Sequence, residues 1–241
     1  MLALSAPVRP SLPKEIRMAR LVSLAAAALL AAVQATRPHA TADAPEKLTF
    51  TFHEDAAGAR WLAEAEHDGA LPAALRAVAA FGPTRRPPFP WAPLRPAFAA
   101  PAPAAGLPPP RAELVSSQVK DGVRHVRVRL SSPRGARTVA LFLPPSARLR
   151  AASVDGVRLD APPRLALWLF GDHRLVACMT TPQSGVTVDL DLEGEAPITA
   201  ILADQSPGLP PSGGALVAAR PATAVPFWDG DTTVATAAVR L

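Results

Sequence analysis

Apolar and polar residues alternate with a period of two over much of the second half of the chain. Residues 125–130 (HVRVRL) place Val126, Val128 and Leu130 on one face, and residues 186–192 (VTVDLDL) repeat the pattern with aspartates on the other face. This alternation is typical of strands that bury one face. Similar short runs, separated by proline, glycine and aspartate, occupy residues 137–144, 150–159, 164–172 and 174–180. The pattern predicts a mainly β protein, an antiparallel β-sandwich of jelly-roll-like type.

The first half contains one strand signal and one helix signal. Residues 46–53 (EKLTFTFH) alternate Leu48, Phe50 and Phe52 with threonines, which predicts a half-buried strand. Residues 72–81 (PAALRAVAAF) begin with proline at a favourable first helical position and carry apolar residues near helical spacing. We expect this segment to be the one short helix of the domain.

A proline-rich segment covers residues 82–110, where eleven of the chain's 29 prolines lie. With so few amide donors we expect extended, polyproline-like chain rather than sheet or helix. A free linker and a ligand for an aromatic groove are both compatible with this composition. Aromatic and aliphatic residues, at Phe89, Trp91, Leu94 and Phe98, favour a third interpretation, in which the segment packs across the domain as an ordered strap.

An apolar run near the N-terminus indicates an export leader. Residues 21–33 (LVSLAAAALLAAV) follow basic residues and precede a polar exit, as in either a signal peptide or a short membrane anchor. Met18 also begins a compact signal-like sequence, so the preceding residues could belong to a wrongly assigned start. We expect a disordered or mis-assigned leader at 1–20, an anchor or signal helix at 21–35, a linker at 36–45 and an exported domain at 46–241, on the periplasmic or extracytoplasmic side.

The charge distribution and the aromatic content of the chain limit the classes of partner that it can bind. The net charge of +5 comes mainly from arginine, because only Lys14, Lys47 and Lys120 are lysines. The basic residues are scattered among 20 acidic ones and the chain has no tyrosine, whereas single-stranded nucleic-acid sites combine basic grooves with stacking aromatics. We therefore expect no nucleic-acid partner. Cys178 is the only cysteine, lies in an apolar run, and is expected to be a buried structural residue.

Ser206 is the best candidate nucleophile, in the sequence DQSPG at 204–208. A nucleophile elbow needs glycine two positions before the serine, but that position is Asp204. Pro207 also removes an amide that an oxyanion hole would use. We expect Ser206 to lie in a turn and not to be catalytic.

Metal ligands are also present but incomplete. His53 with Asp55, and His67 with Asp68, form imidazole and carboxylate pairs, yet a catalytic zinc needs a third convergent ligand. His125 and His173 are expected on separate strand edges or turns, so neither is expected to be the third ligand. Asp229 to Asp231 (DGD) is more typical of a hairpin turn than of a calcium site, and Asp189 and Asp191 of a solubilising strand face. We predict no catalytic residue, no cofactor and no metal site.

Several segments, in chain order, resemble the noncatalytic C-terminal domain of bacterial membrane-bound zinc metallopeptidases of family twenty-eight, the aminopeptidase type related to the endoplasmic reticulum metallopeptidase. The most specific segment runs from ADQSPGLP at 203–210 to DGDTTV at 229–234. Shorter similarities lie at 21–40, 59–66, 87–91, 131–145 and 154–157. The resemblance implies an exported, β-rich domain beyond the last membrane helix. The family's two zinc ions bind in a separate domain, so no catalytic residue carries over to this chain.

Two functions follow as hypotheses. The first is a noncatalytic accessory domain of a membrane-bound zinc metallopeptidase, a fragment or separately encoded part, with the membrane and a zinc peptidase domain as partners. The second is a free-standing secreted binding module for glycan or peptide. The second would use Trp91, Trp168 or Trp228 as a binding platform, although tryptophans at strand spacing more often lie in the core.

Overall fold

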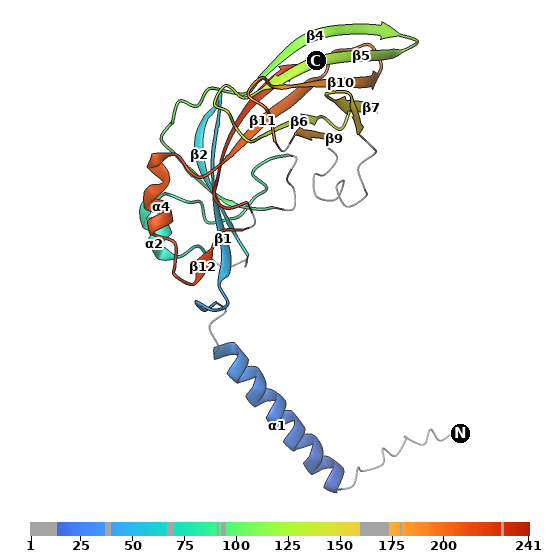
Figure 1. Ribbon diagram of the computed structural model, residues 1–241. Helices are drawn as coiled ribbons and strands as arrows, with labels where there is room; N and C mark the ends of the chain where they lie inside the picture. The colour runs from blue at the N-terminus through green and yellow to red at the C-terminus, as the bar shows by residue number, and fades with distance from the viewer. Residues whose placement is uncertain are drawn as a thin grey trace, which may run out of the picture. The chain divides into compact units, whose positions relative to one another are not determined.

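The computed structural model describes residues 14–36, 40–66, 70–90, 92, 95–159, 174–178, 180–227 and 229–241 (Figure 1). The chain divides into two compact units, Met1–Thr41 and Ala42–Leu241. The first unit contains helix α1 (Lys14–Thr36), which begins before the apolar run because the preceding residues are good helix formers. Within the described residues, no helix is both long enough and apolar enough to cross a membrane.

The larger of two sheets has eight strands. β1 pairs in parallel with β13 and β12, and the other neighbours are antiparallel. The order is β3-β2-β1-β13-β11-β6-β9, with β12 also beside β1. The strands are β1 (Glu46–Asp55), β2 (Gly58–Ala65), β3 (Phe98–Pro101), β6 (Thr138–Leu143), β9 (Arg174–Cys178), β11 (Thr199–Pro207), β12 (Ala224–Val225) and β13 (Thr232–Arg240).

The smaller sheet has five antiparallel strands in the order β4-β5-β10-β7-β8. They are β4 (Arg111–Lys120), β5 (Val123–Ser131), β7 (Leu149–Val154), β8 (Val157–Leu159) and β10 (Val186–Glu193). Two hairpins of this sheet turn at Asp-Gly pairs, and at Asp121 and Gly122 both φ angles are positive, 52° and 73°. Two-residue turns of this kind match the twist of the flanking strands.

The main core lies between the two sheets and confirms the predicted sandwich. Val126, Val128 and Leu130 on β5 are almost completely buried, whereas Arg127 between them is exposed. The same alternation holds along β10, where the four apolar residues are buried. They pack against apolar residues of the larger sheet, such as Leu141.

A second core covers one face of β1, β2 and β3. Phe50, Phe52 and Trp61 lie in it, the last two in edge contact with ring centroids 5.0 Å apart. Helix α2 (Ala73–Val78), which forms within the predicted helical segment 72–81, covers this core together with a 3-10 turn (Pro211–Gly213) and helix α4 (Gly214–Ala218). The expectation of a single helix in the domain was therefore wrong. α4 forms despite two neighbouring glycines because Leu216 is buried in the core.

The sequence pattern of β1 predicted a half-buried strand, but in the structure both faces of the strand are largely buried. Its alternate side chains also lie under cover, with Thr49 at 5% and His53 at 1% exposure. His53 is covered by residues 82–110, the strap, whose Phe89 contacts the imidazole and packs against apolar residues of β6, β11 and β13. Thr49 accepts a hydrogen bond from the amide of Phe227, in the C-terminal segment. We call this side of the larger sheet the strap face; it includes His53, Arg60, Ala203 and Val234.

The strap is not polyproline-like throughout. Four of its residues form β3, which pairs with β2 at the sheet edge. The prediction of no sheet in this segment was wrong, because Phe98, Ala99 and Ala100 all retain amides and an edge strand pairs on one side only. An isolated bridge between Arg86 and Ala97 adds further order.

Candidate ligand-binding site

Side chains of β1 and β2 hold the strap at several points. Arg60 donates to the carbonyl of Pro88 at 3.2 Å, and Arg95 of the strap donates to Glu64 at 2.9 Å. At the far end of the strap, the Glu54 carboxylate accepts hydrogen bonds from three successive amides, those of residues 105, 106 and 107, at 3.3, 3.1 and 3.2 Å. Charged acceptors make stronger bonds than neutral ones, so Glu54 anchors this end of the strap.

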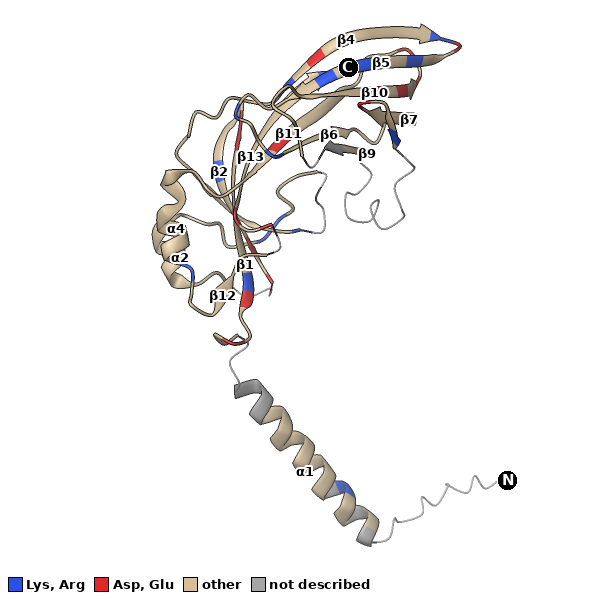
Figure 2. Ribbon diagram, viewed as in Figure 1, with Lys and Arg blue, Asp and Glu red and all other residues tan. Residues whose placement is uncertain are grey.

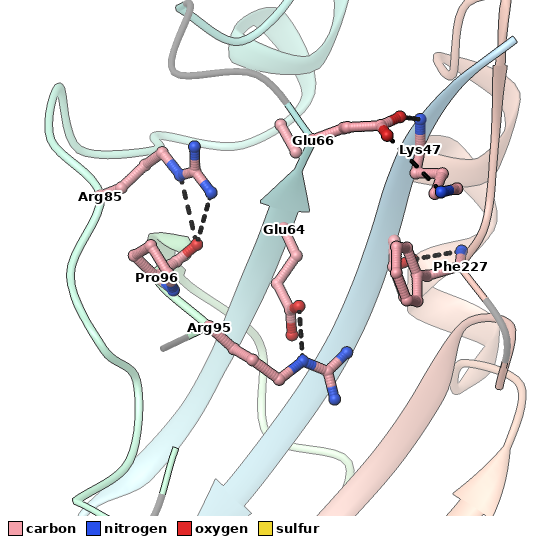
Figure 3. Close-up of a pocket in the computed structure, with 9 residues that line it drawn as sticks. Lys47, Glu64, Glu66, Arg85, Arg95, Pro96 and Phe227 are labelled. Atoms are coloured by element: carbon pink, nitrogen blue, oxygen red, sulfur yellow. Dashed lines mark hydrogen bonds and ion pairs between the residues drawn. The ribbon is translucent and has the colours of Figure 1, made fainter. Parts of the chain in front are cut away.

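Two cavities open on the strap face. The first, of about 200 Å³, is lined by charged side chains, among them Lys47, Glu64, Glu66, Arg85 and Arg95 (Figure 3). In Figure 3 Lys47 points toward Glu66 and Arg95 toward Glu64. The Lys47 Nζ–Glu66 Oε1 distance is 3.5 Å, and the Arg95 Nε–Glu64 Oε2 distance is 2.9 Å. Burial raises the pKa of Glu64, and the neighbouring Arg95 opposes that rise. The charged side chains that line the first cavity therefore largely neutralise one another.

The second cavity, of about 360 Å³, lies at the other end of β1 and β2. His53, Asp55, Arg60 and Thr236 are its polar lining residues. Its remaining walls are apolar and come from the strap, the β1–β2 turn, β11 and β13: Pro88, Phe89, Pro90, Ala56, Ala57, Ile201, Ala237 and Ala238. A mostly apolar cavity with a few converging polar groups is the usual form of a small-molecule site.

His53 is held by both of its ring nitrogens. Its Nδ1 accepts a hydrogen bond from Arg60 Nε at 3.1 Å, so Nε2 carries the proton and donates to Thr236 Oγ1 at 2.9 Å. The Phe89 ring makes an edge contact, with centroids 4.9 Å apart. Burial, and then the charge of Arg60, lower the pKa of His53 to about 4, against the ordinary 6.5. At neutral pH the imidazole is uncharged.

Arg60 and Asp55 carry the only charges among the described residues that line this second cavity. Arg60 makes no ion pair within the described part of the chain; its hydrogen-bond acceptors are the neutral imidazole and the Pro88 carbonyl. One Asp55 oxygen accepts from the amide of Ala57 at 2.8 Å, and the other lies 3.9 Å from His53 Nε2. The site therefore presents one cationic and one anionic group beside an apolar hollow.

The segment that includes Ser206 has a structural role. Ser206 lies on β11 and not in a turn, so the expected turn was wrong; the strand continues through Pro207 because it lies next to β13. Its Oγ accepts from Arg134 Nη1 at 2.5 Å. Arg134 also bonds Asp204, at 2.8 and 3.0 Å, and the backbone of Thr233 at 2.9 Å. Ser132 donates to the second Asp204 oxygen at 2.5 Å, which completes a buried network.

Asp231 is also part of the structure. Its carboxylate accepts from Arg220 at 2.5 and 2.6 Å and from the amide of Phe50 at 2.9 Å. The Arg220 guanidinium lies 4.7 Å above the Phe50 ring. Gly230 has φ of +70° and its amide donates to the Phe227 carbonyl, so the segment forms a turn. The expected hairpin was wrong, because the flanking strands β12 and β13 each pair in parallel with β1. The charged carboxylate of Asp231 thus joins β1 to the C-terminal segment.

The other candidate residues divide between surface positions and positions outside the described residues. Asp189 accepts from Arg127 and Asp191 contacts His125, both at 2.6 Å, across β5 and β10. Figure 2 shows basic segments along β5 beside an acidic segment of β10. The backbone of Cys178 pairs with that of Val139, and its side chain lies outside the described part. His67, Asp68, His173, Trp91, Trp168 and Trp228 also lie outside it. Among the residues that are described, no three histidine, cysteine or acidic side chains are grouped as metal ligands.

Sequence reasoning missed Arg60 and two partly buried arginines, Arg134 and Arg220. Arg60 stands two residues from Leu62 and directly opposite His53 in the β1–β2 register, so strand alternation alone places it on the strap face. Arg134 and Arg220 lie outside strands; their carboxylate partners, Asp204 and Asp231, are 70 and 11 residues away in the chain. No local pattern identifies such pairs.

Comparison with known proteins adds no family assignment. No family model matches the chain, and no curated protein matches it.

Proposed function

We propose that this chain is a noncatalytic accessory domain of a membrane-bound zinc metallopeptidase of family-twenty-eight type, on the exported side of the membrane. The observation that supports a noncatalytic role is the use of Asp204 and Ser206. These are the chemically suggestive residues of the segment most similar to that family, and both bind the Arg134 guanidinium. The Asp204 carboxylate accepts from Arg134 and Ser132. Among the described residues no base is hydrogen-bonded to Ser206, so this serine is not arranged as a nucleophile.

The membrane part of the proposal rests on the N-terminal unit. Helix α1 contains the apolar run that follows Lys14, Arg17 and Arg20, an arrangement that orients the basic end toward the cytoplasm. In this proposal the run is a membrane anchor, or a signal peptide that is removed on export. Either way the sandwich reaches the extracytoplasmic side, where a zinc peptidase domain is its partner.

The native chain tests this proposal through fractionation, intact mass and crosslinking. We expect recovery from the membrane fraction, and a crosslink from the sandwich to a polypeptide with paired zinc ligands, in the same chain or another. A soluble monomer of at most 25.1 kDa that crosslinks to no such polypeptide would contradict the accessory role. Peptidase activity of the purified chain alone that disappears with a chelator would contradict the noncatalytic role.

A free-standing secreted binding module is the second candidate. The observation that favours it is the second cavity, with Arg60 unpaired by any described carboxylate. Tryptophan fluorescence of the full chain, titrated with a panel of glycans and short peptides, tests it. Saturable quenching by one class supports the module, and no response across the panel argues against it.

A further inference from the structure

We propose that the second cavity binds a free α-amino acid with an apolar side chain. The inference does not depend on the accessory role, because it rests only on the walls of the cavity. His53, Asp55, Arg60 and Thr236 form its polar part, and the strap, the β1–β2 turn, β11 and β13 form its apolar part.

The charges of the cavity match the two charges of an amino acid. Arg60 Nε lies 3.1 Å from Nδ1 of His53, and an Asp55 oxygen lies 3.9 Å from Nε2 of the same ring. The cationic and anionic groups are therefore held at the two nitrogens of one imidazole. The carboxylate and ammonium of an α-amino acid are attached to a single carbon, so one molecule can reach both groups.

Arg60 is positioned to receive a carboxylate. Its Nε and one Nη2 proton are used by His53 and Pro88, and its plane is held near the Phe89 ring, 5.6 Å from the centroid. The remaining N–H groups have no acceptor among the described residues. Guanidinium N–H groups bind carboxylates in a fixed geometry, often with two parallel hydrogen bonds. An Arg side chain that is already immobilised loses little further entropy on binding.

Asp55 supplies the complementary group. One of its oxygens is fixed by the Ala57 amide, and the other has no hydrogen-bond donor in the described chain. That oxygen can accept from an ammonium group. An anionic ligand without an ammonium would meet repulsion from Asp55, and a cationic ligand without a carboxylate would meet repulsion from Arg60, so the pair selects zwitterions.

The remaining walls favour an apolar side chain. Phe89, Ile201 and the prolines and alanines around them offer no charged group, and the neutral His53 already uses both ring nitrogens. A volume of about 360 Å³ lies in the range of small-molecule sites and exceeds what glycine would fill. Branched or aromatic side chains would therefore bind more tightly than small ones.

Isothermal titration of the full chain with L-leucine tests the proposal. Saturable binding is expected, and N-acetyl-L-leucine, L-leucinamide and glycine are each expected to bind about tenfold more weakly or worse, because each lacks one of the recognised groups. Leucyl-leucine separates a free amino acid from a peptide terminus. If the dipeptide binds as tightly as leucine, the assignment to free amino acids is wrong.

Substitutions of residues that line the second cavity test whether L-leucine binds there. Arg60→Gln should weaken L-leucine binding by about tenfold or more, yet should not weaken the binding of L-leucinamide further, because the amide lacks the carboxylate that Arg60 receives. Ala238→Leu, at an exposed strand position that lines the cavity, should block binding without disturbing the core. Arg158→Gln, an exposed arginine of the smaller sheet, is the matched control and should bind normally.

Three outcomes would overturn the proposal: no saturable binding of L-leucine at millimolar concentrations, equal binding of the blocked analogues, or normal binding by a folded Ala238→Leu variant. Circular dichroism of each variant establishes that it is folded. If Arg60→Gln fails to fold, the Ala238→Leu variant and the ligand series still decide the question.

Discussion

At the scale of single residues, the buried carboxylate of Asp204 shows why a chemically suggestive segment has a structural role. Its side chain has no exposed surface and is balanced by Arg134 and Ser132. An ionised carboxylate removed from water is costly unless it is paired and hydrogen-bonded. The network joins residues 132–134 to β11 and β13, so it holds together three segments that are distant in the sequence.

Arg134→Ala should therefore destabilise the domain strongly. The change leaves Asp204 buried without its positive partner, for which we expect a loss of about 3 to 5 kcal/mol in the free energy of unfolding. Urea denaturation followed by circular dichroism measures it. Arg137→Ala, at an exposed arginine of the same segment, should change stability by less than about 0.5 kcal/mol. Equal effects of the two substitutions would show that the network contributes little.

The lowered pKa of His53 predicts that the stability of the domain depends on pH. The pKa is lowered to about 4 in the folded chain, so the unfolded chain, with a pKa near 6.5, binds a proton first as the pH falls. Stability at neutral pH is then lost progressively between about pH 6.5 and 4, by up to about 3 kcal/mol from this group. Above pH 6.5 both states are neutral at this residue and it adds no pH dependence.

A substitution isolates this effect from that of the carboxylates. His53→Gln keeps an acceptor for Arg60 and a donor for Thr236 but cannot titrate. We expect the variant to show a shallower loss of unfolding free energy between pH 6.5 and 4 than the original chain. Parallel curves for the two proteins over that interval would contradict the assignment of this pH dependence to His53.

At the scale of elements, α4 owes its existence to one buried side chain. The helix has five residues, begins with glycine and has no side-chain cap, so its local propensity is poor. Leu216 is 1% exposed in the core formed with β1 and β2, whereas its neighbour Val217 is 44% exposed. Packing of Leu216 therefore offsets the weak propensity of the helix.

Leu216→Ala should cost about 2 to 5 kcal/mol of unfolding free energy, the range for truncating a buried leucine. Val217→Ala is a control in the same helix and should cost less than about 1 kcal/mol, because most of its side chain is already in water. Urea denaturation of the two variants provides the comparison. Similar losses would mean that the helix is held by its backbone and not by its apolar side chain.

The elements that the sequence predicted share one property, a local period. The alternation along β5 and β10 identifies their buried faces, because side chains of a strand point alternately to its two sides. The pattern of β1 predicted the strand but not the burial of Thr49 and His53, since the residues that contact them, Phe227 and Phe89, belong to segments that are distant in the sequence. α4 was missed because it depends on the packing of Leu216 against segments that are distant in the sequence, and not on a local period.

The candidate site could be predicted only in part. His53 and Asp55 stand out in the sequence, and strand pairing adds Arg60. The other walls come from residues 88–90, from β11 and from β13, which no local pattern brings together. From the sequence, His53 and Asp55 are an incomplete set of metal ligands and no metal site is predicted, but their neighbour was not foreseen: in the structure the Arg60 side chain donates to Nδ1 of the imidazole.

At the scale of the whole domain, the larger sheet belongs to both cores. One of its faces packs on the smaller sheet through β6 and β11, and its β1 and β2 strands carry the second core beneath α2 and α4. β13 lies between β1 and β11 and joins the two regions by hydrogen bonds on both sides. Loss of either core should therefore weaken the other.

This arrangement predicts a single cooperative unfolding transition for Ala42–Leu241. Leu190→Ala, in the smaller sheet, should cost about 2 to 5 kcal/mol and should accelerate amide hydrogen exchange in β2 as much as in β10, although β2 lies in the other core. Leu114→Ala, at a half-exposed position of β4, is the control and should leave exchange in both strands nearly unchanged. If β2 keeps its protection while β10 loses it, the two cores unfold separately, and the shared sheet does not couple them.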